Sequence, residues 1–192
     1  MAGDYVTIVI AAMLVNNLVL VQFLGICPFL GVSSRLSTAI GMSAAVMFVM
    51  TIAGIATYLI RQFLLMPLEL QFLQTVAFIL VIASLVQLVE IVMKKVSPPL
   101  HQALGVFLPL ITTNCAIMGV ALLIVQHQYD LAQTILFAIA SAIGFTIALV
   151  AFAGIRERLA LMPVPKAMRG GPIALVTAGL LALAFMGFQG LA

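Results

Sequence analysis

Cys27 and Cys115 are the residues of this chain best suited to chemistry, and the sequence contains no other cysteine. Residues 25–32 read GICPFLGV and residues 113–120 read TNCAIMGV, so each cysteine stands four residues before a Gly-Val pair. Both motifs lie inside long apolar runs. Thiolate sulfur is a preferred ligand of soft metal ions and of iron–sulfur clusters. The matched pair therefore predicts one shared metal site.

The possible roles of the two cysteines differ in the ligands that they need. A buried free cysteine can serve as a small apolar residue, and a disulfide between two spans would need a particular geometry. A structural zinc ion takes four ligands, whereas the only histidines, His101 and His127, are expected in loops far from the sulfurs. A [2Fe–2S] cluster takes four thiolates. This chain would then hold half of the ligands, and a second copy or a related subunit would supply the rest.

Composition places these motifs in a membrane. Hydrophobic residues make up 65% of the 192 residues and charged residues 7%, whereas a soluble domain carries about 25% charged residues. The net charge of +3 does not indicate a nucleic-acid partner, because the basic residues lie between apolar runs and act there as topology signals. We expect a single membrane domain over residues 1–192 with the lipid bilayer around it.

Six apolar runs predict an all-α integral membrane protein with six transmembrane helices. A helix satisfies its own backbone groups in lipid, and about 20 apolar residues span the hydrocarbon core. The runs cover residues 6–34, 39–60, 72–93, 103–125, 131–155 and 173–188.

The loops between these runs predict the orientation, since Lys and Arg are enriched in cytoplasmic loops. Arg61 is the only basic residue after an even-numbered run. The loops after the first, third and fifth runs carry Arg35, Lys94, Lys95, Arg156, Arg158, Lys166 and Arg169. Both termini are therefore expected outside the cell membrane, in the periplasm of a Gram-negative cell.

A second pair of similar segments indicates an inverted repeat. Residues 60–67 read IRQFLLMP and residues 155–163 read IRERLALMP. Each half of the chain holds three runs, so the second half enters the membrane from the opposite face, as in inverted-topology repeats. We place the first repeat at about residues 1–97 and the second at about residues 98–192.

The first and fourth helices are expected to break near the cysteines. The first run has about 29 residues, or roughly 43 Å as one straight helix, against a hydrocarbon core of about 30 Å. Glycines and a proline surround Cys27 within residues 25–31, while Gly105 and Pro109 precede Cys115; both residue types weaken a helix. A broken helix offers free N–H groups and partial positive charge at its new N-terminus, which would stabilise an anionic cluster.

Several amides lie in or near the same runs, among them Asn16, Asn17 and Asn114. Amide side chains inside a membrane commonly join helices by hydrogen bonds. The alternative is that these asparagines shape the pocket of the cluster.

These motifs resemble those of the membrane subunits shared by the Rnf electron transport complex and the sodium-pumping NADH:quinone oxidoreductase, the Rnf/Nqr family. The most specific stretches are residues 15–29, VNNLVLVQFLGICPF, and residues 107–116, FLPLITTNCA, supported by GIRER at 154–158 and LAFMGF at 183–188. Within the family the chain is most similar to the A subunit of Rnf. The E subunit tends to carry charged residues where residues 120–123 read VALL, and the equivalent quinone-oxidoreductase subunit is the alternative.

The resemblance implies that Cys27 and Cys115 supply half the ligands of a [2Fe–2S] cluster shared with a homologous E-type subunit, which brings two further cysteines. It also implies a translocase complex in the bacterial inner membrane, with other subunits that carry flavin and iron–sulfur groups. Such a complex couples electron flow between ferredoxin and NAD to movement of Na⁺ or H⁺. The chain would be an electron conduit and not catalytic alone.

Two other classes of function fit the pattern less well. A small secondary transporter can share inverted repeats and broken helices, but it should carry charged or polar groups inside the membrane, and this chain has almost none. A purely structural assembly subunit would have no use for Cys27.

Overall fold

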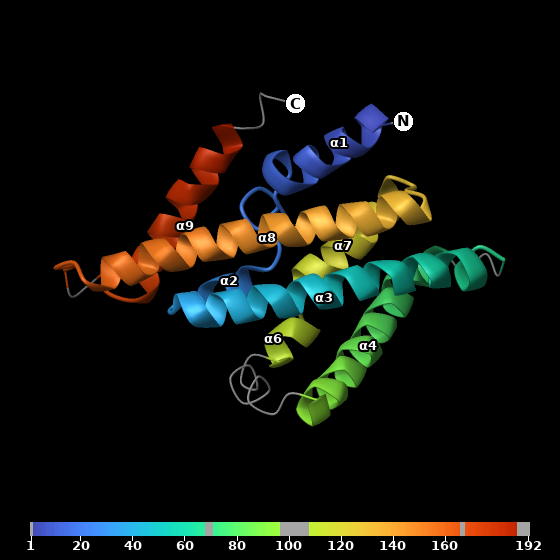
Figure 1. The fold of residues 1–192 in the computed structure, drawn as a ribbon, viewed down its shortest axis with the longest axis horizontal. Coiled ribbons are helices and arrows are strands. Elements are labelled where there is room, and N and C mark those ends of the chain that lie inside the picture. The colour runs from blue at the N-terminus through green and yellow to red at the C-terminus, as the bar shows by residue number, and fades with distance from the viewer. Residues whose placement is uncertain (1, 68–70, 97–107, 166–167, 188–192) are drawn as a thin grey trace.

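The computed structural model describes residues 2–67, 71–96, 108–165 and 168–187, and every regular element within them is helical (Figure 1). The elements are α1 (Ala2–Ile10), a π-helical turn (Ala11–Val15), α2 (Ile26–Gly31), α3 (Leu36–Ile60), a second π-helical turn (Arg61–Leu65), a 3-10 turn (Gln71–Leu73), α4 (Gln74–Val96), α6 (Leu108–Thr112), α7 (Cys115–Gln126), α8 (Leu131–Ala160) and α9 (Gly171–Met186).

Three of the helical segments are long and apolar enough to cross a membrane: Leu36–Leu65, Gln74–Val92 and Leu131–Ala160. Three shorter apolar helical segments accompany them, at Tyr5–Val15, Leu110–Gln126 and Gly171–Met186. Each of the six predicted runs thus contains an apolar helix. The number of membrane crossings stays a prediction, because the first and fourth runs are interrupted and the last helix is short.

Helices α3 and α8 form the centre of the molecule, where they lie side by side and antiparallel (Figure 1). Small residues bring them together, since a Cβ atom added at Gly54 would lie 3.3 Å from the Cβ of Ala138. Close backbone approach through glycine and alanine is typical of helix pairs in membranes, where no hydrophobic effect drives association. Helices α1 and α9 lie on one side of this pair, and α4 and α6 lie on the other.

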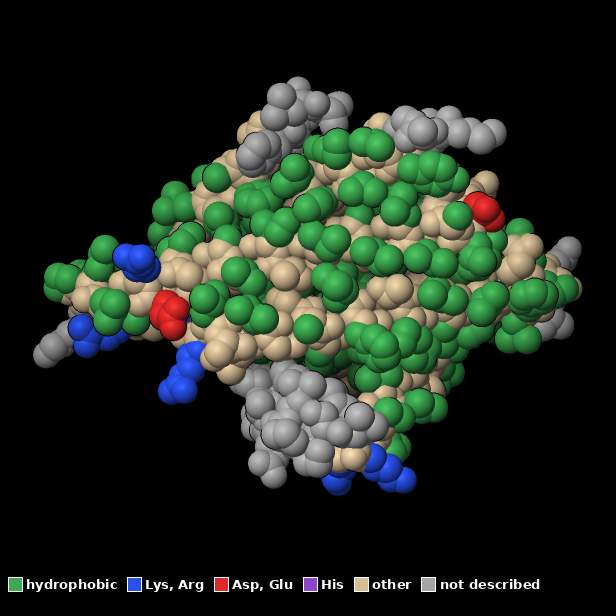
Figure 2. All heavy atoms as spheres, viewed as in Figure 1, with side chains coloured by type: hydrophobic (Ala, Val, Ile, Leu, Met, Phe, Trp, Pro, Cys, Tyr) green, Lys and Arg blue, Asp and Glu red, His purple; other side chains and the backbone are tan. Residues whose placement is uncertain are grey.

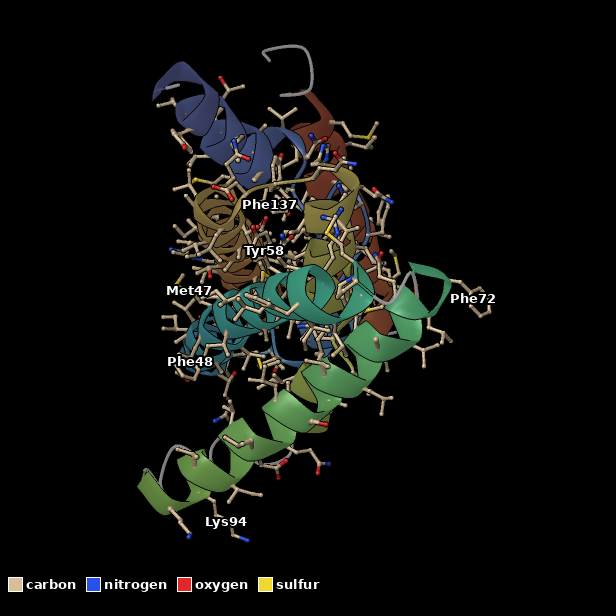
Figure 3. All side chains as sticks on the ribbon, turned by 90° about the vertical axis from the view of Figure 1, so that its right-hand side faces the viewer. Met47, Phe48, Tyr58, Phe72, Lys94 and Phe137 are labelled. Carbon is tan, nitrogen blue, oxygen red and sulfur yellow. The ribbon has the colours of Figure 1, made fainter. Side chains whose placement is uncertain are left out.

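The outer surface is apolar, as a lipid environment requires. Helix α4 diverges from the central pair, with Phe72 at the beginning of its segment and Lys94 near its end (Figure 3). Its exposed side chains include Ile79, Leu80 and Leu88. Figure 2 shows apolar side chains over most of the visible face, while Lys and Arg gather where α8 ends and α3 begins and at the tip of α4. Large contiguous apolar surface marks contact with lipid or with partner proteins.

Both predicted interruptions are present. The first helical segment ends at Val15, residues 16–25 are outside any helix, and α2 starts at Ile26. In the second half, α6 ends at Thr112 and α7 starts at Cys115. The first break is ten residues wide, from 16 to 25, and the second is two residues wide, from 113 to 114.

Candidate functional site

Asn17 stabilises the wide first break. Its Nδ2 donates to the carbonyl oxygens of Met13, at 3.2 Å, and Gly144, at 2.9 Å. Its Oδ1 accepts from the backbone N–H groups of Val19, at 3.1 Å, and Leu20, at 3.4 Å. Asn17 is fully buried, and an amide has two donors and one acceptor oxygen. One side chain thus replaces helical hydrogen bonds in the break and joins the break to α8.

The same contact explains why α8 carries glycine at position 144. A Cβ atom there would lie 2.8 Å from the carbonyl oxygen of Met13 and 3.2 Å from Nδ2 of Asn17. The broken segment therefore reaches α8 only because Gly144 has no side chain. The interhelical role that the sequence allowed for these asparagines is confirmed for Asn17.

The two cysteine motifs meet at Gly25. Its backbone N–H donates to Sγ of Cys115 at 2.9 Å, across 90 residues of sequence. Gly25 has a left-handed conformation, with φ 83° and ψ 26°, just before α2. A Cβ atom at Gly25 would lie 3.1 Å from the Cβ of Ala116 and 3.2 Å from Oδ1 of Asn114. Cys27 follows two residues later, so its Cα lies within about 7 Å of the Gly25 Cα. The structure thus brings the two thiols into one neighbourhood.

Both thiols sit in the first turn of a helix. Cys27 is the second residue of α2, and Cys115 is the first residue of α7. Both are exposed, and no disulfide joins them. N–H groups in the first turn of a helix have no intrahelical partners and stabilise negative charge near them. The thiols therefore face outward from two helix starts that favour anionic sulfur.

Asn114 caps α7 beside Cys115, and this leaves a narrow second break. Its Oδ1 accepts from the N–H of Ala116 at 3.0 Å. Its Nδ2 has no hydrogen-bond partner in the described part of the chain, although Asn114 is only 4% exposed. A buried amide without a partner costs about 1–3 kcal/mol.

Arg156 fixes the other end of the helix that carries Cys27. Its Nη1 donates to the carbonyl oxygen of Leu30 at 2.8 Å and to Oγ of Ser33 at 2.6 Å. The guanidinium lies 5.8 Å from the ring centre of Phe152, which stacks on Phe29 of α2 at 4.3 Å between ring centres. A cation near a helix C-terminus is favourable. Short helix α2 is thus held at its start by the Gly25 contact and at its end by Arg156.

The sequence shows no basic residue close to either cysteine along the chain, and the role of Arg156 was missed because Arg156 lies 126 positions from Leu30. The sequence analysis placed Arg156 in the loop after the fifth run, whereas α8 continues to Ala160 and includes it.

The described residues do not assemble a complete metal site of their own. They contain no group of three or more His, Cys, Asp or Glu side chains that would hold a metal ion. His127 lies at the exposed end of α7, where it stacks on Tyr129 at 5.2 Å, as expected for a loop histidine. His101 lies outside the described residues. A metal site at Cys27 and Cys115 therefore stays a prediction, and it would need ligands from elsewhere.

These features define a helical membrane protein with an exposed cysteine at each of two helix breaks. The model of a family described as "Rnf-Nqr subunit, membrane protein" matches residues 5–192, and the chain belongs to this family. It is 60% identical to the A subunit of the ion-translocating oxidoreductase complex of Syntrophotalea carbinolica over 184 residues, which are 96% of this chain and 95% of the relative.

Two further relatives also align over nearly their whole length. The A subunit of the Na⁺-translocating ferredoxin:NAD⁺ oxidoreductase complex of Acetobacterium woodii is 59% identical over 184 residues, 96% of each chain. The A subunit of the ion-translocating oxidoreductase complex of Shewanella baltica is 55% identical over 189 residues, 98% of each chain. The resemblance to the A subunit, found from the motifs around Cys27 and Cys115, is confirmed.

Proposed function

We propose that this chain is the A-type membrane subunit of an ion-translocating Rnf-type oxidoreductase complex, and that Cys27 and Cys115 hold half of a [2Fe–2S] cluster. The observation that carries the proposal is the hydrogen bond from Gly25 to Cys115, which joins the two cysteine motifs. The names of the relatives support the Rnf complex, with ferredoxin and NAD⁺ as redox partners of the whole assembly, over the related quinone oxidoreductase.

The residues around the thiols fit an anionic sulfur cluster. Such a cluster would supply one-electron transfer, and its net charge of about −2 with four thiolates requires compensation. The N–H of Gly25, which donates to Cys115, and the partial positive charge at the starts of α2 and α7 would supply it without a buried ammonium or guanidinium. Hydrogen bonds to cluster sulfur raise the reduction potential, so these donors would tune electron acceptance.

The missing two ligands imply a partner at this surface. Both cysteines are exposed, so another membrane subunit can approach them directly. A homologous E-type subunit with the same broken helices would bring two further thiolates and close the site. The cluster would then lie between two membrane subunits and pass electrons across the bilayer, between flavin- and iron–sulfur-bearing subunits on either side.

The membrane arrangement that we propose is six spans in two inverted three-helix repeats. The second helices of the two halves, α3 and α8, are antiparallel neighbours at the centre of the fold, which suits a pseudo-two-fold axis in the membrane plane. Basic side chains gather at the end where α8 finishes and at the tip of α4. With this end in the cytoplasm, both termini are periplasmic, and the chain lies in the bacterial inner membrane.

The test uses the complete complex, purified with the wild-type chain and with Cys27→Ser or Cys115→Ser. We expect the reduced wild-type complex to show the electron paramagnetic resonance of a [2Fe–2S] cluster that each substitution abolishes or alters, together with a loss of bound iron. An unchanged signal and iron content in both variants would instead support a transporter or structural role. A Ser43→Ala variant controls for general damage, because the Ser43 hydroxyl bonds to the Ala39 carbonyl oxygen of its own helix.

A further inference from the structure

A cavity of about 340 Å³ lies between the end of α8 and the start of α9. Two arginines line it, Arg156 from α8 and Arg169 from the connection that precedes α9. The rest of its wall is mainly apolar and includes Leu159, Met162, Val164 and Ile173. It therefore combines concentrated positive charge with hydrophobic surface in one small volume.

Neither guanidinium has a carboxylate partner within the part of the chain that the structure describes. Arg156 is already oriented, because its Nη1 is bound to Leu30 and Ser33, and its other N–H groups remain. A guanidinium offers five donors in a planar fork that matches phosphate oxygens. Holding the side chain in place beforehand reduces the entropy that binding would cost. The cavity is thus prepared for an anion with several oxygens.

The position of the cavity indicates which anion it receives. It lies where α8 ends and α9 begins, among the basic residues of this end of the molecule, which we place at the cytoplasmic face. Basic pockets between transmembrane helices on the cytoplasmic side bind anionic lipid head groups. A soluble anion would have no use for the apolar wall that Leu159 and Ile173 provide.

We propose that this cavity binds an anionic phospholipid. The phosphate diester lies between Arg156 and Arg169, and the glycerol and the upper part of the acyl chains contact the apolar wall. The cysteines do not line this site, but Arg156 also contacts the end of α2. The test therefore changes Arg169 and leaves Arg156 in place.

The experiment counts lipids bound to the purified complex by native mass spectrometry, after delipidation in detergent and titration with phosphatidylglycerol or phosphatidylcholine. Wild type is compared with Arg169→Gln, which changes an exposed lining residue that makes no described contact with α2. Arg158→Gln is the matched control, because Arg158 is an exposed arginine of the same region outside the cavity lining.

We expect wild type and Arg158→Gln to bind one phosphatidylglycerol with equal affinity. Arg169→Gln should bind it about fivefold more weakly, because one basic residue near an anionic head group contributes about 1 kcal/mol. Equal binding by wild type and Arg169→Gln would overturn the proposal. Equal retention of phosphatidylcholine would reduce the site to an apolar groove and overturn it as well. Displacement of the lipid by millimolar inorganic phosphate would assign the cavity to a soluble anion and overturn the lipid assignment.

Discussion

Gly25→Ala tests the contact between the two cysteine motifs most directly. Gly25 has φ 83°, a region that residues with a side chain rarely adopt. The added methyl group would lie 3.0 Å from Cε2 of Phe145 and 3.2 Å from Oδ1 of Asn114. Both neighbours must therefore move, and the N–H that donates to Cys115 moves with the strained backbone.

The cost has two parts. The left-handed conformation of a residue with a Cβ costs about 1–2 kcal/mol, and an extra methyl in a tightly packed position costs about 1–3 kcal/mol. The sum, about 2–5 kcal/mol, is large against a typical unfolding free energy of about 5–15 kcal/mol. Loss of the bond to Cys115, worth about 1 kcal/mol, would lower the potential of a one-electron cluster by about 40 mV, because the donor stabilises the more negative reduced state.

The assay combines the thermal stability of the purified complex with a redox titration followed by electron paramagnetic resonance. Gly41→Ala is the control, since a Cβ at Gly41 meets no atom within 4 Å and alanine favours a helix. We expect Gly25→Ala to melt several degrees lower and to show a more negative potential, while Gly41→Ala matches wild type or is more stable. Identical stability and potential in both glycine variants would refute the role assigned to Gly25.

Three further substitutions test the scaffold of the site. Asn17→Leu removes the acceptor of the Val19 and Leu20 N–H groups and the bonds to Met13 and Gly144. It should cost about 3 kcal/mol, seen as a lower melting temperature; an unchanged melting temperature would contradict this. Gly144→Ala should destabilise the protein by about 1–3 kcal/mol, whereas Gly154→Ala should not, because a Cβ at Gly154 meets no atom within 4 Å. Equal melting temperatures of the two variants would argue against the close contact between Gly144 and the first break. Arg156→Gln removes two charge-assisted hydrogen bonds to the end of α2, so it should destabilise the protein by about 2 kcal/mol and reduce iron retention. Arg158→Gln, which changes an exposed side chain, should do neither. Equal iron content in both variants would show that the contact of Arg156 with α2 is dispensable.

The class of the protein and the position of both breaks could be predicted from the sequence because they depend on local properties. Apolar run length indicates a membrane protein, and the glycines and proline around Cys27 weaken a helix wherever the rest of the chain lies. The matched motifs around Cys27 and Cys115 were enough to predict a shared site. The contact between Gly25 and Cys115 bears out their proximity.

The details that depend on distant residues could not be predicted. The width of the first break follows from Asn17, whose partner Gly144 lies 127 positions away. The contact of Arg156 with the end of α2 is equally distant in sequence. Each depends on how α8 packs against the first half of the chain, and no local pattern encodes that packing.

The most direct test of the half-site is to measure iron and acid-labile sulfide in complexes in which only the partner subunit's cysteines are changed to serine. Our account predicts that the wild-type complex holds two irons at this site, and that these irons are lost when either this chain or its partner lacks cysteine while the subunits still assemble. Retention of both irons by Cys27 and Cys115 without the partner's thiols would contradict it.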